Sequence, residues 1–430
     1  MLPPPALSEA LLQFIWQHQY FHTQALVTTA GEAITIHQRG TLNRDQGPDF
    51  LHGQVSVGGT RLVGNIELHL RSSHWQRHGH SSDPRYQQLI LHVVWEDDAP
   101  VMLQGQLLPT LELKDRIAHG LLNKYAQLMA NHPFVPCQEQ LPVLDSFQWL
   151  GFKQRLATER LQRKQALVLA TAQQPDWEEL LWQQLAATAG GRVNAQCFRQ
   201  LATDLPLRLL ARQRPHLHQL EALLLGQAGL LPSESEDDYV SLLKREFATL
   251  QAKFRLPPPL PPPSTLRMRP AAFPHLRLAQ LASLVHRQER LFSHCLEAVH
   301  VPDLLQWFQV TASDYWHQHY HFSAPSPPQP KTLGVATAAL LIINAVVPVL
   351  HAYARFKGDA GLQERCLQWL EALPGERNQV TQGFAARGVK AASALDSQAL
   401  IELKTAYCDQ RNCLQCRVGY QLLRQPVQPG

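Results

Sequence analysis

The chain has 430 residues, of which 45% are apolar and 17% are charged, a composition that excludes a disordered chain and predicts two or three folded domains. The formal net charge of +4 is too small to indicate a nucleic-acid-binding protein by itself. The charge is uneven, however: residues 1–145 carry −4 and the remainder carries +8. An acidic N-terminal part suits a bound cation, and a basic remainder suits a polyanionic partner.

The N-terminus reads as the start of a cytoplasmic protein. It has no basic segment followed by a cleavage site, and residues 8–20 predict an amphipathic helix capped near Ser8. Residues 332–354 lack Lys, Arg, Asp and Glu, and are long enough to cross a membrane. Asn344, Pro348 and His351 lie within them and favour a buried core helix. The sequence therefore predicts no membrane partner.

Short segments with β propensity precede residue 113, and helical periodicity dominates after Lys114. The predicted fold class is α+β, with a small mixed-sheet N-terminal domain followed by a long all-α region. Proline-rich stretches at 256–264 and 324–330 read as stiff connectors. The predicted domains are an α/β domain, a helical domain and a second helical domain with a cysteine cluster, at residues 1–135, 136–256 and 264–430.

A candidate metal site lies in the segment GPDFLHGQVSVGGTRLVGNIELH, residues 47–69. Strand alternation places Glu67 and His69 side by side, on the face opposite Leu68. If Asp49 precedes the neighbouring strand of a hairpin, its carboxylate converges with that of Glu67. Two carboxylates suit Mg²⁺ or Mn²⁺ and leave positions for a phosphate and a water molecule. The alternative is an ordinary hairpin whose acidic residues are unrelated.

The Pro48-Asp49 pair, followed by Glu67-x-His69 on an apolar strand, resembles the PD-(D/E)xK nuclease superfamily. The resemblance implies a restriction-endonuclease-like core, with Asp49 and Glu67 as metal ligands. The sequence departs from the superfamily at His69, where a lysine is usual. A histidine would act as a base or a metal ligand rather than as a permanent charge. Loss of activity, leaving a non-catalytic nucleic-acid-binding or protein-binding module, is the alternative.

Histidines cluster just after this strand. His74, His78 and His80 are candidate metal ligands, because imidazole is the commonest ligand of transition metals. They leave open a third function, a histidine-rich zinc hydrolase acting on a small substrate. His92 lies in an apolar strand and is expected to be a hydrogen-bonded core residue.

A longer pattern resembles a bacterial family known as a domain of unknown function. The pattern is GPDF, GNIELH, SSHW, HGH and DPRYQQLILHVVWEDD, followed by ALLLGQAGLL, RMRPAAFPHLRLAQLA, SDYWHQHYHF and LGVATAALLIINAVVPVLHAYA. The resemblance implies one integrated architecture, with an α/β front and a helical back. It implies no activity.

Cys408, Cys413 and Cys416 form a C-x4-C-x2-C array near the C-terminus. This spacing is typical of thiolate ligands of zinc or of an iron–sulfur cluster, and Cys137 is the candidate fourth ligand. Some exonucleases of the PD-(D/E)xK superfamily hold an iron–sulfur cluster by cysteines split between distant parts of the chain, and the arrangement here is similar. The alternative is a set of reduced thiols packed in a C-terminal helix.

Two segments of the basic part are candidates for nucleic-acid contact. The guanidinium groups of Arg267, Arg269 and Arg277 suit phosphates, and the rings of Trp316 and Tyr320 suit unpaired bases. Each has a structural alternative, as a solvated surface or as core. The basic run at 153–164 is predicted to be a helix face in water. Together these patterns predict a metal-dependent nuclease or phosphodiesterase acting on nucleic acid, DNA in particular.

Overall fold

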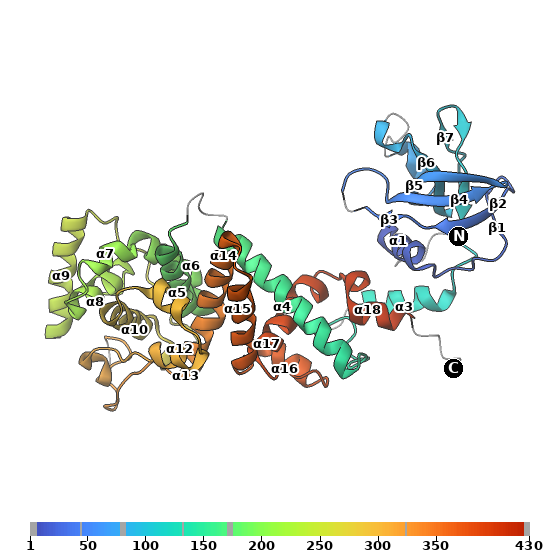
Figure 1. Ribbon diagram of the computed structural model, residues 1–430. Coiled ribbons are helices and arrows are strands. Elements are labelled where there is room, and N and C mark those ends of the chain that lie inside the picture. Colours follow the sequence, from blue (N-terminus) through green and yellow to red (C-terminus); the bar gives the residue numbers. More distant parts are fainter. Residues whose placement is uncertain are drawn as a thin grey trace. The chain divides into compact units, whose positions relative to one another are not determined.

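The computed structural model describes residues 7–43, 45–77, 83–130, 133–169, 175–322 and 325–424. The chain divides into two compact units: unit 1 comprises residues 1–148 and 403–430, and unit 2 comprises residues 149–402. The sequence predicted three consecutive domains, whereas here the C-terminal residues group with the N-terminal ones. The coarse fold class is confirmed, because a mixed N-terminal sheet is followed by a mostly helical region (Figure 1).

Unit 1 is built on a seven-stranded mixed sheet. Its main order is β1-β2-β4-β5-β6-β9, with β3 paired to β4. Strands β4 and β5 are antiparallel, whereas β5 pairs with β6, and β6 with β9, in parallel. The strands of the sheet are β1 (Leu26–Val27), β2 (Ala33–Gln38), β3 (Thr41–Leu42), β4 (Phe50–Val57), β5 (Thr60–Arg71), β6 (Leu89–Glu96) and β9 (Thr110–Glu112). A separate two-stranded ribbon joins β7 (Met102–Leu103) and β8 (Gln106–Leu107).

The hairpin of β4 and β5 is closed by Gly58 and Gly59, whose φ angles are +55° and +85°. Two consecutive positive φ angles are what a tight two-residue hairpin turn requires, and glycine adopts them without strain. Gly64, further along β5, lies against its neighbour: a Cβ atom there would be 2.3 Å from the carbonyl oxygen of Gln88. The close approach of β5 to the segment before β6 therefore depends on a glycine.

Strand β5 is buried on both faces at its centre, where four consecutive residues, Ile66 to His69, are buried. The polar face that carries Glu67 and His69 is therefore buried along this stretch, as the core face is. The reason is that helices cover the parallel part of the sheet, as is usual for parallel strands. Helix α1 (Glu9–His18) packs against β5, and so does the short helix α2 (His74–Arg77).

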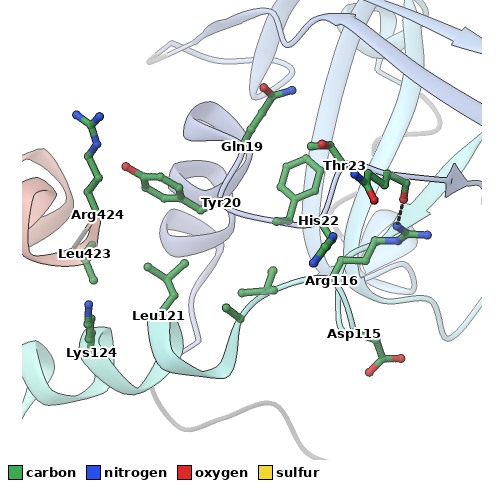
Figure 2. A pocket seen from close by; sticks show the side chains of 14 residues that line it. Gln19, Tyr20, His22, Thr23, Asp115, Arg116, Leu121, Lys124, Leu423 and Arg424 are labelled. Carbon is green, nitrogen blue, oxygen red and sulfur yellow. Dashed lines mark hydrogen bonds between the residues drawn. The ribbon is translucent and has the colours of Figure 1, made fainter. Parts of the chain in front are cut away.

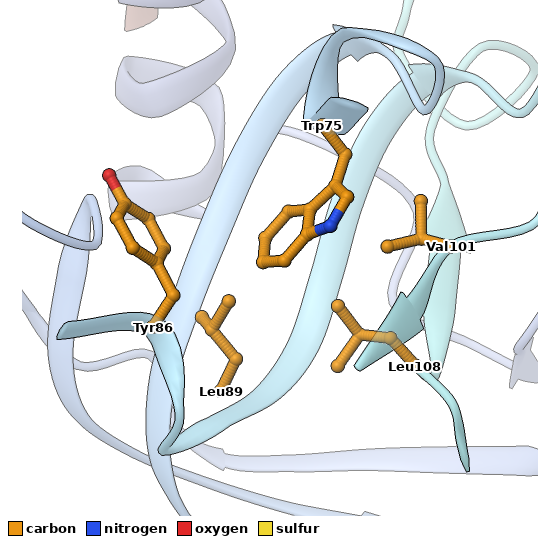
Figure 3. Close-up of a cluster of buried hydrophobic side chains, with 5 residues drawn as sticks. All are labelled: Trp75, Tyr86, Leu89, Val101 and Leu108. Atoms are coloured by element: carbon orange, nitrogen blue, oxygen red, sulfur yellow. The ribbon is translucent and has the colours of Figure 1, made fainter. Parts of the chain in front are cut away.

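A small apolar cluster lies beside the central strands (Figure 3). Trp75 of α2 is 1% exposed and stands edge-on to Tyr86, with ring centroids 5.9 Å apart. Tyr86 belongs to the 3₁₀ turn η2 (Pro84–Tyr86), which leads into β6. Leu89, Val101 and Leu108 complete the cluster. It fixes the segments before and after β6 on the sheet.

The rest of unit 1 is helical. Helix α3 (His119–Met129) and the C-terminal helix α18 (Arg417–Arg424) pack together, and Tyr420 of α18 lies 6.2 Å from Phe14 of α1, centroid to centroid. The segment before α18 contains a π-helix, η6 (Leu403–Cys408), and a 3₁₀ turn, η7 (Cys413–Gln415). These packing contacts explain why the C-terminal residues join the N-terminal unit.

Unit 2 is helical, and α4 begins at the boundary between the units. Its helices are α4 (Ser146–Leu169), α5 (Trp177–Ala189), α6 (Gly191–Asp204), α7 (Leu207–Ala211), α8 (Leu217–Gln227), α9 (Asp238–Phe254), α10 (Pro274–Arg287), α11 (Leu291–Glu297), α12 (Val301–Trp307), α13 (Val335–Leu341), α14 (Val347–Lys357), α15 (Ala360–Ala372), α16 (Gln379–Ala385) and α17 (Ala394–Glu402). Short turns η3 (Pro270–Ala272) and η4 (Asp314–Gln318) and a π-helix η5 (Ile342–Val346) lie between them.

The apolar segment forms one continuous helix, Val335–Lys357, made of α13, η5 and α14. By length and composition it could cross a membrane, and 72% of its most apolar window is buried within the structure. The central helix of a soluble protein has the same properties.

The basic run on α4 faces a buried polar network, so the prediction of a fully solvated helix face is wrong. Lys164 donates to Asn344 Oδ1 at 2.8 Å and to Gln398 Oε1 at 2.7 Å. Arg160 also donates to Gln398 Oε1, at 2.7 Å, and its guanidinium group lies 3.6 Å from the buried carboxylate of Glu402. Burial lowers the pKa of Lys164 to about 7. Sequence periodicity alone does not distinguish such a network from a solvated face.

Candidate functional site

Two acidic side chains meet at the start of the β4–β5 hairpin. The N–H of Asp49, one residue before β4, donates to Glu67 Oε2 at 3.0 Å. The N–H of Leu68 donates in turn to Asp49 Oδ2 at 3.0 Å. These two hydrogen bonds hold the two carboxyl groups next to each other. The predicted convergence of Asp49 and Glu67 is therefore a feature of the structure.

Irregular strand pairing places these carboxyl groups. Between Phe50 and Gly53, strand β4 has one residue more than its partner β5, and His52 within this bulge has φ +61°. A second register shift lies between β5 and β6, opposite Asn65 and Ile66. Bulges of this kind redirect side chains and are frequent beside functional sites. Next to Glu67, the pairing of β5 is thus irregular with both of its neighbouring strands, β4 and β6.

Helix α1 supplies two further polar side chains, Glu9 and Gln13, that the sequence interpretation missed. Gln13 Nε2 donates to Asp49 Oδ1 at 2.8 Å. The carboxylate of Glu9 contributes to the raised pKa values of Asp49 and Glu67 and lies 3.7 Å from His74 Nδ1. The two residues are four apart on one helix and therefore share a face. That spacing is a signal that the sequence did contain.

The environment of these carboxyl groups disfavours negative charge. Burial raises the pKa of Asp49 to about 6, against the opposing hydrogen bonds from Leu68 and Gln13. Burial and the neighbouring Asp49 raise the pKa of Glu67 to about 9. Two neighbouring carboxylates in a largely buried site repel each other, and a cation between them would relieve both the repulsion and the cost of burial.

Histidines continue the cluster across the sheet. His69 Nδ1 lies 2.9 Å from His92 Nε2, and His69 Nε2 lies 3.7 Å from Glu67 Oε1. His92 is fully buried and hydrogen-bonded, as predicted. The His74 ring lies 6.3 Å from that of His69, centroid to centroid. His78 and His80 lie outside the described residues.

Tyr86 also belongs to this site, although the sequence interpretation did not include it. Burial raises the pKa of its phenol to about 12, and the nearby Glu67 and Asp49 contribute further to this rise. In Figure 3 its hydroxyl points away from Val101 and Leu108. Its ring therefore belongs to the apolar cluster, while its hydroxyl lies within the electrostatic reach of the carboxyl groups.

The raised pKa values predict how the stability of the metal-free protein depends on pH. Between about pH 4.5 and 9 the folded state binds more protons at Glu67 than the unfolded state does, so stability falls as pH rises through this window. In EDTA we expect the Tm of wild type to fall from pH 5 to pH 9 more steeply than the Tm of Glu67→Gln. The difference between the two falls should be several °C, because 1 kcal/mol of stability corresponds to about 2–4 °C in Tm. Calorimetry of both proteins checks this, and parallel curves would contradict it.

The four predicted cysteine ligands gather in unit 1. Burial raises the pKa of the Cys137 thiol to about 12, and the neighbouring Cys416 and Cys413 contribute further to this rise. Burial also raises the pKa of Cys408, with further contributions from Cys416, Cys137 and Cys413. Cys137 lies more than 270 positions before the other three, so their mutual influence reflects the fold. None of these four thiols forms a disulfide.

The residues predicted to contact nucleic acid have different environments. Arg267 and Arg269 are exposed in the segment before η3. Arg277 is largely buried and donates to Gln280 Oε1 at 2.8 Å and to Thr337 Oγ1 at 3.2 Å.

The two aromatic candidates also occupy structural positions. Trp316 is fully buried and donates its Nε1–H to Glu221 Oε2 at 2.8 Å, so its ring has no exposed face. Tyr320 lies under the ammonium group of Lys331, which is 3.9 Å from the ring centroid. As the structure stands, Arg277 and Trp316 serve the core of unit 2.

A pocket of about 620 Å³ lies elsewhere in unit 1, at the end of α1 and the start of α3 (Figure 2). Tyr20, Arg116, Lys124 and Arg424 are among its lining residues. Arg116 donates to the carbonyl oxygens of Gln24 and Ala25, at 3.1 and 3.0 Å. The carboxyl–histidine cluster contributes no lining residue, so this pocket is a separate feature.

Within the described ranges, no three or more His, Cys, Asp or Glu side chains are grouped so that they could hold a metal ion as they stand. The chemistry of the donor sets nevertheless fits two classes of ion. Paired carboxylates suit Mg²⁺ or Mn²⁺, and four thiols suit zinc or an iron–sulfur cluster.

The fold and this site together define a two-unit α+β protein with a buried carboxyl–histidine cluster on a mixed sheet. Residues 9–379 match the model of the family described as "Protein of unknown function (DUF2851)", and the chain belongs to that family. The predicted membership of a domain-of-unknown-function family is thereby confirmed. No curated protein and no solved structure matched the chain.

Proposed function

We propose that the protein is a metal-dependent nuclease or phosphodiesterase acting on nucleic acid, with a cysteine-ligated structural metal or iron–sulfur cluster. One observation carries the proposal: at the start of a hairpin the buried Glu67 accepts from Asp49 N–H, the half-buried Asp49 accepts from Leu68 N–H, and Asp49 is close enough to raise the pKa of Glu67. A purely structural hairpin has no need for two adjacent carboxyl groups in a largely buried place, where negative charge is costly.

Asp49 and Glu67 would hold Mg²⁺ or Mn²⁺. When bound, such an ion supplies Lewis-acid stabilisation of the negative charge on the phosphate and lowers the pKa of a water molecule. Gln13 orients Asp49 through its hydrogen bond, and the N–H of Asp49 orients Glu67. These contacts fix the directions of the carboxylate oxygens before any ligand arrives.

His69 would take the proton from the attacking water. When His69 Nδ1–H donates to His92 Nε2, Nε2 of His69 is left as the acceptor on the side of Glu67. The water oxygen bonds to phosphorus, the bond to the leaving oxygen breaks, and the water's proton passes to His69 Nε2. The leaving oxygen takes its proton from solvent. In this proposal His69 activates the attacking water as a base, whereas the lysine of the superfamily acts on the water through its permanent charge.

The cysteine site supports a structural role. Cys137 joins three cysteines of the C-terminal segment, and the fold brings these distant parts of unit 1 together. A shared metal would lower the pKa values of these thiols, which burial and their mutual proximity now raise. It would also tie the C-terminal segment of unit 1 to the N-terminal part of that unit.

A second candidate is a nucleic-acid-binding protein that has kept the fold and lost turnover. It is favoured by one observation: His69 is 1% exposed and engaged by His92, where the nuclease pattern has a lysine. This candidate predicts binding with a steep salt dependence and no cleavage with any metal.

A direct assay separates the two candidates. Purified protein is incubated with single-stranded and double-stranded DNA and RNA, with Mg²⁺, with Mn²⁺, or with EDTA. The nuclease proposal predicts shortened strands with a divalent metal and intact strands in EDTA. Intact strands under every condition, together with salt-dependent binding, would support the second candidate.

A further inference from the structure

We propose that a pocket in unit 2 binds an unpaired base of single-stranded nucleic acid, with Arg267 and Arg269 contacting the adjoining phosphates. This inference rests on the proposed function, because it names the form of the substrate. The pocket has a volume of about 360 Å³, within the range of small-molecule sites. Four of its lining residues are aromatic or imidazole rings, and Leu230, Pro232 and the hydroxyl-bearing Thr265 complete the lining.

The walls of this pocket are rings in mutual contact. Phe273 and His321 lie 5.8 Å apart, centroid to centroid, and His275 and Phe322 lie 5.4 Å apart and edge-to-face. Phe322 packs in turn on the buried ring of Trp316 at 5.3 Å. The buried tryptophan therefore supports a wall of the pocket. Flat rings of this kind suit stacking with any base, because every base has a π face.

His275 gives the pocket a polar edge. Its Nδ1 atom is buried and has no hydrogen-bond partner among the described residues. Burial lowers the pKa of this imidazole to about 4, so the ring is neutral at physiological pH. A neutral imidazole has one donor and one acceptor nitrogen, which match the edge of a base. A buried polar atom without a partner is costly and indicates a missing ligand group.

The segment carrying the two arginines is anchored next to the pocket. Asn194 is 4% exposed and donates to the carbonyl oxygen of Ser264 at 2.8 Å, while Ser264 N–H donates back to Asn194 Oδ1 at 2.9 Å. Thr265 lines the pocket and accepts from Met268 N–H at 3.2 Å, closing a tight turn. Arg267 within this turn has φ +59°, a strained conformation for a non-glycine residue. The backbone that carries the two exposed arginines is thus held next to the pocket.

The test measures binding in EDTA, so that it does not depend on cleavage. Fluorescence anisotropy compares a labelled single-stranded oligothymidylate, its blunt duplex, and an abasic strand with the same phosphates. We expect tightest binding to the single strand. Phe273→Ala should weaken it by about tenfold or more, and Phe273→Trp should retain it. Arg267→Ala with Arg269→Ala should reduce the salt slope by about 1 to 2.

Matched controls are Phe356→Ala, an exposed phenylalanine elsewhere in unit 2, and Arg287→Ala, an exposed arginine at the end of α10. Both should bind as wild type does. Equal affinity for the abasic strand, or unchanged affinity in Phe273→Ala, would overturn the pocket while leaving the nuclease proposal standing. Pocket-dependent binding without cleavage under any metal would support the pocket and refute the nuclease.

Discussion

Replacing Asp49 by Asn and Glu67 by Gln abolishes metal-dependent cleavage, with an expected loss of about 10³-fold or more. The physical reason is that a bound divalent ion contributes several kcal/mol of transition-state stabilisation, and each 1.36 kcal/mol is about tenfold in rate. Both replacements keep the shape of the side chain and an oxygen that accepts the hydrogen bonds from Leu68 and Asp49 N–H. The measurement is the initial rate of strand cleavage with Mn²⁺.

This double variant should fold, because it removes charge that is costly to bury. In the absence of metal it should be at least as stable as wild type at pH 8, since burial raises the pKa values of both groups it replaces. Glu32→Gln, an exposed carboxylate before β2, is the control and should cleave as wild type does. Undiminished cleavage by the folded double variant would exclude these residues as the site.

We expect the replacement of Cys413 and Cys416 by Ser to remove the proposed metal of the cysteine site and to destabilise unit 1. Structural zinc sites contribute on the order of 10 kcal/mol of apparent binding free energy, which is folding free energy for the segment that carries the ligands. We therefore expect loss of bound metal in elemental analysis and a large fall in Tm. Anaerobic preparations that are brown, with absorbance near ~400 nm, would identify an iron–sulfur cluster, and colourless ones with metal would identify zinc.

Cys197→Ser is the matched control, because Cys197 is a half-buried thiol of α6 in unit 2. It should keep the metal content of wild type. Wild-type protein purified without oxygen and carrying no zinc or iron would contradict the proposed site. So would a Cys413→Ser, Cys416→Ser variant that retains the wild-type metal.

The sequence predicted the pairing of Asp49 with Glu67 because a strand period of two and a two-residue glycine turn define a hairpin closely. It did not predict the bulge at His52, since a bulge depends on pairing with the neighbouring strand and leaves no clear local pattern. It also did not predict that the face carrying Glu67 is buried. The helices that bury that face come from elsewhere in the chain, and their docking is a tertiary event.

The same limit explains the helical region. A helix with one polar side can face either water or a buried polar network, and the sequence pattern is the same in both cases. Lys164 of α4 was therefore assigned to the surface, although it lies in such a network. Trp316 was a candidate for stacking on bases, with a core position as the alternative, and the structure buries its ring against Phe322. The sequence does not distinguish the two positions, because the orientation of each ring depends on the fold. Cys137 was singled out by its proline-flanked loop and does gather with the C-terminal thiols.

We propose that the carboxylates of Asp49 and Glu67 share one divalent ion. Titration of metal-free protein with Mn²⁺, followed by the paramagnetic resonance signal of the free ion and by calorimetry, tests this sharing directly. We expect one Mn²⁺ site per chain in wild type and in Glu32→Gln, and its loss in the double variant of Asp49 and Glu67. An identical binding curve for wild type and the double variant would contradict it.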